Sequence, residues 1–112
     1  MFENRAGRVL GAEGREVGTV YLEEEELRRR STPRWWGVLG GWVVEPAIHQ
    51  HYWSSDGSIY EDAIVYGEGL RRSVGLWKAS QVEVDGVIRP VRWATIAESE
   101  EVRAWMEGRA QD

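Results

Sequence analysis

Cysteine is absent from the 112-residue chain. That absence excludes a disulfide framework, a thiolate zinc site and a cysteine nucleophile, and it makes a cytoplasmic location the default expectation. Long hydrophobic runs are also missing, because no apolar stretch approaches the roughly 18 to 20 residues of a membrane-spanning helix. The first residues, MFENRAGR, lack the basic start and apolar core of a secretory signal peptide. We therefore expect a soluble, cytoplasmic protein without a membrane partner.

Basic residues are outnumbered and scattered: 14 Lys and Arg stand against 19 Asp and Glu, for a formal net charge of −5. No continuous basic stripe is present to follow a phosphate backbone, which argues against nucleic acid as a partner. Common enzyme motifs are missing as well, among them the P-loop, the dinucleotide-binding glycine fingerprint and the G-x-S-x-G nucleophile elbow. We predict that the protein uses no cofactor.

Phenylalanine occurs once, whereas tryptophan occurs seven times and tyrosine four times. The N–H of Trp and the O–H of Tyr find partners at interfaces and wet binding surfaces, although buried rings also supply the core of a short chain. Position helps to separate these readings. The stretch from Trp35 to Leu70, here called the acidic aromatic segment, contains no Lys or Arg. It carries both histidines, much of the aromatic content and the carboxylates Glu45, Asp56, Glu61, Asp62 and Glu68. We expect the functional site there.

The N-terminal part reads as strand and then helix. Arg15 to Leu22 is rich in β-branched and aromatic residues, which predicts a strand, and a shorter strand at Arg8 to Leu10 would pair with it. The following EEEELRRR places Glu before Arg at i, i+4 spacing, so we predict a short solvated helix near residues 23–30. Trp35 to Glu45 contains three glycines and reads as a bent strand that Pro46 interrupts.

Two hairpins are signalled by Asp56-Gly57 and Asp85-Gly86. With the first turn centred on Asp56-Gly57, Trp53 faces Tyr60 and His51 faces Asp62. Side-chain alternation then gives two mixed faces, which favours a ribbon covered on both sides by the rest of the fold and by a ligand or partner. One face holds Ala47, His49, His51 and Trp53 with Tyr60, Asp62, Ile64 and Tyr66; the other includes Ile48, Gln50, Tyr52 and Glu61.

The C-terminal part is predicted to hold a further strand around Leu70 to Leu76 and a helix that begins at a Ser99 N-cap and stops at Gly108. Pro90 has no N–H to donate, which places its strand at a sheet edge or bulge. Together these elements predict one α+β domain spanning residues 1–112. It is mainly antiparallel, with a bent sheet or small barrel or roll of about six strands, a C-terminal helix and the short helix near 23–30.

The histidines permit three kinds of chemistry. A cross-strand His51–Asp62 hydrogen bond that serves only structure is favoured. A catalytic reading uses His51 with Asp62 as a general acid/base pair, and His49 beside them. A 2-His-1-carboxylate metal site from His49, His51 and Asp62 is a further alternative, but such sites usually come with a fuller ligand set, and we predict no metal.

The favoured function is non-catalytic binding of a small neutral or cationic ligand, or a peptide, on an aromatic and acidic surface. The candidate contacts are Trp35, Trp36, Trp42, Trp53, Tyr60 and Glu61. Rings beside carboxylates suit a cation through cation–π contact and ion pairing. A homodimer that covers the second mixed face is also expected. The alternatives are a small hydrolase, isomerase or metal-dependent enzyme that uses the His/Asp pair, and a protein–protein interaction module that buries the Trp-rich face.

Overall fold

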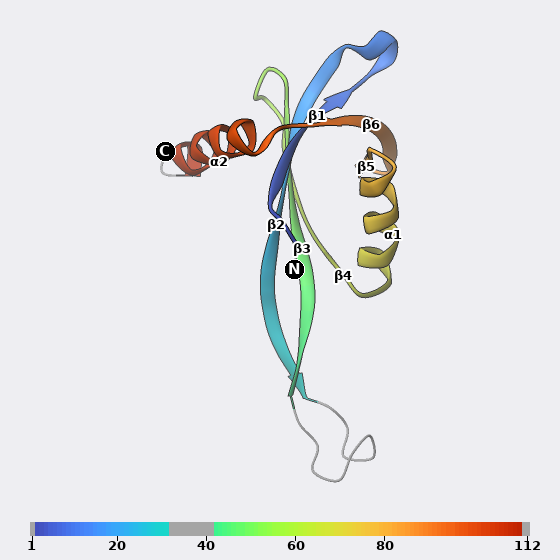
Figure 1. Cartoon of the computed structure of the whole chain (residues 1–112), viewed down its shortest axis with the longest axis vertical. Helices are drawn as coiled ribbons and strands as arrows, with labels where there is room; N and C mark the ends of the chain where they lie inside the picture. The colour runs from blue at the N-terminus through green and yellow to red at the C-terminus, as the bar shows by residue number, and fades with distance from the viewer. Residues whose placement is uncertain (1, 32–41, 111–112) are drawn as a thin grey trace.

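A computed structural model describes residues 2–31 and 42–110. It has the predicted α+β class: six antiparallel strands form a strongly curled half-barrel sheet, with two helices (Figure 1). The sheet order is β4-β3-β2-β1-β6-β5. The elements are β1 (Arg5–Leu10), a 3-10 turn (Ala12–Gly14), β2 (Glu16–Ser31), β3 (Trp42–Ser54), β4 (Tyr60–Tyr66), α1 (Gly67–Lys78), β5 (Gln81–Val84), β6 (Val87–Trp93) and α2 (Ile96–Ala110). Neither described helix is long and apolar enough to cross a membrane.

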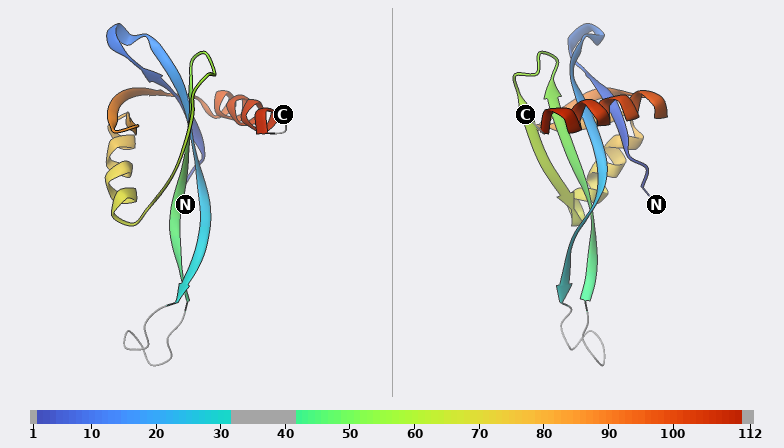
Figure 2. Two further views of the ribbon diagram at one scale, coloured as in Figure 1. Left: turned by 180° about the vertical axis from the view of Figure 1, so that it is seen from behind. Right: turned by 90° about the vertical axis from the view of Figure 1, so that its left-hand side faces the viewer.

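The two helices lie on opposite sides of the sheet (Figures 1 and 2). Strand residues alternate between the sides, so that Val20 and Leu22 face one core while Tyr21 faces the other. The core on the α1 side is the larger one, and its buried members are Val9, Val20, Leu22, Ile48, Trp77, Val82 and Val91. The core on the α2 side comprises Ala6, Tyr21, Trp53 and Val102, with Ala94 and Met106 packed against it.

Both predicted hairpins and their registers are confirmed. In β3–β4, His51 pairs with Asp62 and Trp53 pairs with Tyr60. In β5–β6, Val84 pairs with Val87 across a turn in which Asp85 and Gly86 have φ angles of 52° and 78°. Positive φ at both central residues is what a type I′ turn requires, and it explains why the Asp-Gly signal was reliable.

The predicted helix near residues 23–30 is wrong, because β2 runs through this segment without a break in strand assignment. Each i, i+4 ion pair offers a helix only about 0.2 to 0.5 kcal/mol. The strand pairs with β3 from Gly18 opposite Ser54 to Ser31 opposite Trp42, so the ladder outweighs the local preference. A register shift between Glu26 and Arg29 lies next to Pro46 on β3, which shows that the proline marks a bulge rather than the end of a strand.

The predicted strand at Leu70 to Leu76 is also wrong, since this segment belongs to α1. Leu70, Val74 and Trp77 follow i, i+4, i+7 spacing, and all three contact the core on the α1 side. The even-numbered apolar positions of the segment had suggested a period of two. Trp77, only 2% exposed, is the residue that fixes the helical period.

The ends of α2 differ from prediction as well. Thr95, not Ser99, caps the helix: its Oγ1 accepts from the Glu98 N–H at 3.2 Å and donates to the Glu98 carboxylate at 3.1 Å. This side-chain cap at Thr95 leaves Ser99 free to contact β1. The helix also continues past Gly108 to Ala110. Pro90 lies in β6, an interior strand, immediately before the three residues that pair with β1.

Candidate functional site

A row of rings runs along β3 on the side of the sheet that carries α2. The centroids of His49 and His51 are 3.8 Å apart with an interplanar angle of 37°, and His51 stacks on Trp53 at 5.7 Å and 15°. Trp105 of α2 meets Trp53 edge-on at 5.2 Å. The row exists because His49, His51 and Trp53 are every second residue of one strand and therefore point to the same face of the sheet, as the sequence predicts.

His51 bridges the two strands beside β3. Its Nδ1 lies 2.8 Å from the Tyr60 hydroxyl on β4, and its Nε2 lies 2.7 Å from Glu23 Oε1 on β2. His51 itself is 7% exposed, so its ring is largely shielded from bulk water. Burial, followed by the charges of Asp62 and Glu23, raises the pKa of the Tyr60 phenol above its ordinary value.

His49 repeats the same arrangement one row further along the sheet. Its Nε2 contacts Asp62 on β4, and its Nδ1 lies 2.7 Å from Glu25 Oε2 on β2. Glu23 Oε1 is 3.6 Å from the same Nδ1. The shortest contacts of each histidine thus go to diagonal neighbours, which lie within reach of long side chains on a twisted sheet, while the longer contact of His49 goes to Glu23 directly opposite it on β2.

The diagonal contacts change the predicted His51–Asp62 pair. The two residues are directly opposite in the backbone register, as predicted, but the described hydrogen bond of Asp62 to a histidine goes to His49. The structure therefore brings both histidines together with Asp62 and Tyr60. Asp62 contacts His49 instead of His51, and His51 contacts Tyr60.

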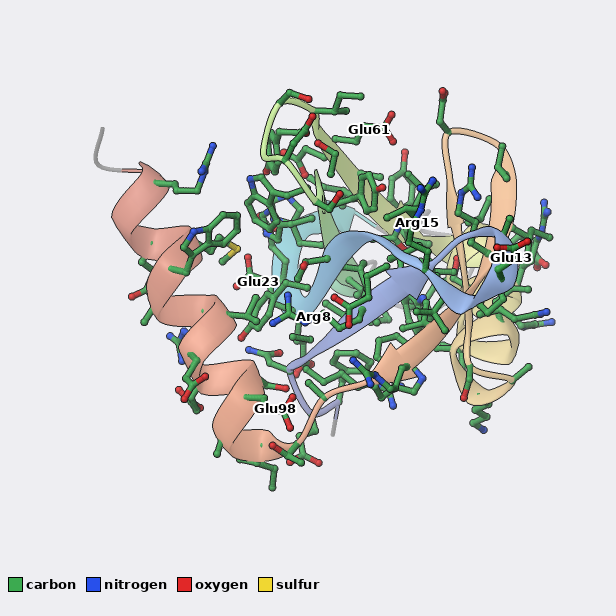
Figure 3. The ribbon with its side chains drawn as sticks, turned by 90° about the horizontal axis from the view of Figure 1, so that it is seen from above. Arg8, Glu13, Arg15, Glu23, Glu61 and Glu98 are labelled. Atoms are coloured by element: carbon green, nitrogen blue, oxygen red, sulfur yellow. The ribbon has the colours of Figure 1, made fainter. Side chains whose placement is uncertain are left out.

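Glu23 and Glu25 complete the cluster, and sequence reasoning missed both. Treating residues 23–30 as a helix placed these carboxylates on a solvated surface. A signal was present: if the strand continues past Leu22, then Tyr21, Glu23 and Glu25 share one face by simple alternation. Figure 3 shows Glu23 on the side of the sheet that faces α2.

A recess of about 380 Å³ opens beside the ring row. Its lining residues are His51, Trp53, Tyr60, Met106, Glu107 and Arg109. Two of its walls are aromatic, and Tyr60 lies 4.9 Å from Trp53 between ring centroids. The guanidinium of Arg109 sits 4.9 Å from the ring centroid of Trp105, so the rim of the recess already carries one cation–π contact.

The remaining predicted contacts lie elsewhere. Glu61 pairs with Tyr52, so side-chain alternation places it on the face of the sheet opposite the ring row. Trp35 and Trp36 lie outside the described residues. Trp42 belongs to β3, but its side chain lies outside the described part of the structure.

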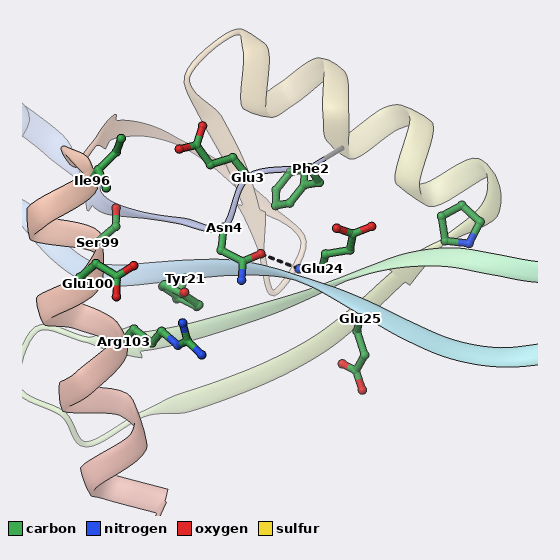
Figure 4. Close-up of a pocket in the computed structure, with 11 residues that line it drawn as sticks. Phe2, Glu3, Asn4, Tyr21, Glu24, Glu25, Ile96, Ser99, Glu100 and Arg103 are labelled. Atoms are coloured by element: carbon green, nitrogen blue, oxygen red, sulfur yellow. Dashed lines mark hydrogen bonds between the residues drawn. The ribbon is translucent and has the colours of Figure 1, made fainter.

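A larger hollow of about 680 Å³ lies near the first turns of α2 (Figure 4). Tyr21 and Arg103 line it together with the N-terminal segment, where Asn4 Oδ1 accepts from the Glu24 N–H at 2.9 Å. Burial raises the pKa of Tyr21, and the positive charge of Arg103 opposes that rise. The hollow contains none of the predicted site residues.

Comparisons with protein-family models, with curated proteins and with solved structures returned no match, so the function has to be argued from the site itself.

Proposed function

We propose that the protein binds a small cationic or neutral ligand in the recess of Trp53, Tyr60 and His51, without transforming it. One observation carries the proposal: the rings of Trp53 and Tyr60 and the carboxylate of Glu107 line one recess, and a second carboxylate, Glu23, contacts the His51 ring that also lines it. Burial first, and then the negative charges of Asp62 and Glu23, raise the pKa of the Tyr60 phenol, which lines the recess together with Trp53. A cation entering here gains from ring quadrupoles and from negative charge at the same time.

The contact of Arg109 with Trp105 supports a positive charge on the ligand. Its guanidinium lies over Trp105 at the rim, so this surface accepts a planar cation on an aromatic face. A ligand bearing an amine or guanidine would find the same chemistry on Trp53 and Tyr60. An anion would meet the Glu107 carboxylate in the lining, with Arg109 as the one basic group among the lining residues.

A catalytic role is less well supported by the contacts. General acid/base chemistry needs a ring nitrogen within reach of a substrate atom. Tyr60 and Glu23 hold the two nitrogens of His51, and Asp62 and Glu25 lie at those of His49. Non-catalytic binding requires no change in these contacts.

The proposal is tested by isothermal titration calorimetry with three probes of similar shape: 2-phenylethylamine, 2-phenylethanol and phenylacetate. We expect the amine to bind most tightly and the acid most weakly. Tyr60→Ala removes one wall and should weaken amine binding about tenfold or more. Tyr66→Ala is a matched control, because Tyr66 lies on the same face of β4, shares the 49% exposure of Tyr60 and does not line the recess. Tighter binding of phenylacetate than of the amine contradicts the proposal.

A protein partner is the second candidate function, and the exposure of β4 favours it. β4 is the first strand in the sheet order, and Tyr60, Ile64 and Tyr66 on it are 49%, 41% and 49% exposed. Edge strands with exposed apolar side chains pair readily with another strand, in a peptide or in a second copy of the chain. Sedimentation at micromolar concentration should then show a dimer that Ile64→Lys dissociates; a monomer at all concentrations argues against self-association.

A further inference from the structure

We propose that Glu23, His49 and His51 bind a divalent transition-metal ion of the zinc type, with Glu25 as a fourth ligand. The site adjoins the aromatic recess but does not depend on any organic ligand binding there. It also replaces the carboxylate of the metal alternative drawn from the sequence, because the β2 residue Glu23 takes the place assigned to Asp62.

The donor atoms already converge. One donor atom from each of Glu23, His49 and His51 lies within 4.8 Å of the other two. Glu23 Oε1 is 2.7 Å from His51 Nε2 and 3.6 Å from His49 Nδ1. A tetrahedral zinc ion with bonds of about 2.0 to 2.2 Å separates its ligands by about 3.4 Å. An ion would take its place among these atoms once the Glu23–His51 contact has opened to that separation.

Glu25 supplies the fourth direction. Its Oε2 lies 2.7 Å from His49 Nδ1, yet this buried oxygen accepts no aligned hydrogen bond from the described residues. A buried carboxylate oxygen without such a bond is costly, and a cation is the partner that satisfies it best. Glu25 thus points toward the same nitrogen that would face the ion.

The ring nitrogen of each histidine that would not bind the ion already has a hydrogen-bonding partner. A ligating imidazole usually donates its second N–H to a carboxylate or another acceptor, which fixes the ring and strengthens the ligand. Asp62 occupies that position at His49 Nε2, and the Tyr60 hydroxyl occupies it at His51 Nδ1. A hydroxyl both donates and accepts, so the His51 proton is free to move to Nδ1 when Nε2 binds the ion.

Charge and ligand type select the class of ion. Glu23, Glu25 and Asp62 gather around two imidazoles, and a divalent cation would neutralise much of this negative charge. Two nitrogen ligands favour zinc, copper, nickel or iron over magnesium and calcium, which prefer all-oxygen sites. The side chains of His49 and His51 are 17% and 9% exposed, so the ion would be shielded from water on the β3 side.

The test is titration of untagged, chelator-treated protein with ZnCl₂ by calorimetry, without any organic ligand. We expect saturable binding of one ion per chain. Glu23→Gln should weaken binding at least 100-fold, and His49→Gln should do the same through a separate ligand. Asp62→Asn, which alters only the outer contact, should weaken it 10- to 100-fold with the stoichiometry unchanged. Co²⁺ should bind with the intense visible absorption of a tetrahedral site.

Glu24→Gln is the matched control, since Glu24 and Glu25 point to opposite sides of β2 (Figure 4). It should leave zinc affinity unchanged. Circular dichroism of each variant without metal separates loss of a ligand from loss of the fold. Failure of the wild type to bind one ion saturably, or equal losses from Glu23→Gln and Glu24→Gln in folded protein, would overturn the proposal. Because only the ion is added, the amine titration can fail while this one succeeds, and the reverse.

Discussion

The backbone N–H of Ala6 donates a 3.0 Å hydrogen bond to the Oγ of Ser99, joining the first strand to the last helix across 93 positions of sequence. Ala6 is 1% exposed and Ser99 is 6% exposed. The bond satisfies a backbone donor that water cannot reach, and it places α2 over the sheet where Val102 and Met106 pack.

Ser99→Ala should therefore lower the free energy of unfolding by about 1 to 3 kcal/mol, because it leaves the Ala6 N–H buried without an acceptor. Urea denaturation followed by circular dichroism measures the change. Ser55→Ala removes an exposed hydroxyl and should shift the free energy of unfolding by less than about 0.5 kcal/mol. Equal effects of the two substitutions would show that the Ala6–Ser99 bond contributes little.

Two glycine substitutions should have opposite signs. A Cβ at Gly18 would overlap the Tyr52 ring and lie 2.5 Å from the backbone oxygen of Trp53, so Gly18→Ala should destabilise the fold by about 1 to 3 kcal/mol. A Cβ at Gly75 in α1 meets nothing within 4 Å, so Gly75→Ala should stabilise by about 0.5 to 1 kcal/mol. Thermal unfolding of both variants beside the wild type tests the pair, and a stabilising Gly18→Ala would contradict this packing.

Asp56 should contribute pH-dependent stability. Its Oδ1 accepts hydrogen bonds from the Ser54 hydroxyl at 2.7 Å, the Ser58 hydroxyl at 2.6 Å and the Ser58 N–H at 2.9 Å. These bonds lower the pKa of Asp56 from 3.8 to about 2. A carboxyl whose folded pKa is depressed stabilises above its unfolded pKa and loses that contribution as pH falls through the folded value.

The melting temperature of the wild type should therefore exceed that of Asp56→Asn at pH 7. The difference should persist down to about pH 4 and shrink as the pH approaches 2, where Asp56 becomes neutral like Asn. Differential scanning calorimetry at a series of pH values measures it. A difference that stays constant from pH 7 to pH 2 would mean that the charge of Asp56 is not what stabilises the turn.

Trp77 and Trp105 should respond differently to truncation. Trp77 is 2% exposed in the core on the α1 side, so Trp77→Ala should cost about 3 to 5 kcal/mol. Trp105 is 42% exposed, and Trp105→Ala should cost markedly less because much of its ring is already in water. Equilibrium denaturation of both variants measures the two changes in the free energy of unfolding. A larger decrease for Trp105→Ala than for Trp77→Ala would contradict the assignment of the larger core to the α1 side of the sheet.

The sequence could predict the parts of this fold that depend on local chemistry. The Asp85-Gly86 turn requires residues that tolerate positive φ, and the register that sets His51 opposite Asp62 followed from centring the other hairpin on Asp56-Gly57. The fold class followed from the same hairpin signals. The predicted gathering of His49, His51, Trp53 and Tyr60 on one face required nothing beyond alternation from a known turn.

The errors arose where distant contacts decide the outcome. Residues 23–30 contain good helical ion pairs, but the ladder with β3 holds them extended. That one error hid Glu23 and Glu25, the carboxylates that the histidines contact. Asp62 lies opposite His51 in the register but contacts His49. This diagonal contact depends on the twist of the sheet, which residue pairing alone does not predict.

The hairpin of β2 and β3 continues beyond its neighbours. The last residue pair of β1 with β2 is Arg5 with Leu22, and that of β4 with β3 is Ala47 with Tyr66. Within the described part of the chain, the pairs from Glu26–Pro46 outward to Ser31–Trp42 therefore belong to β2 and β3 alone. Two-stranded ribbons are marginally stable in water, and their amide protons should exchange with solvent faster than those of the six-stranded part. Glu25 lies at the inner end of this ribbon, next to the row of His49. When the ribbon opens, the histidine cluster is the next part of the sheet to be affected. Binding of a metal ion to the cluster should therefore slow the exchange of amide protons along the ribbon.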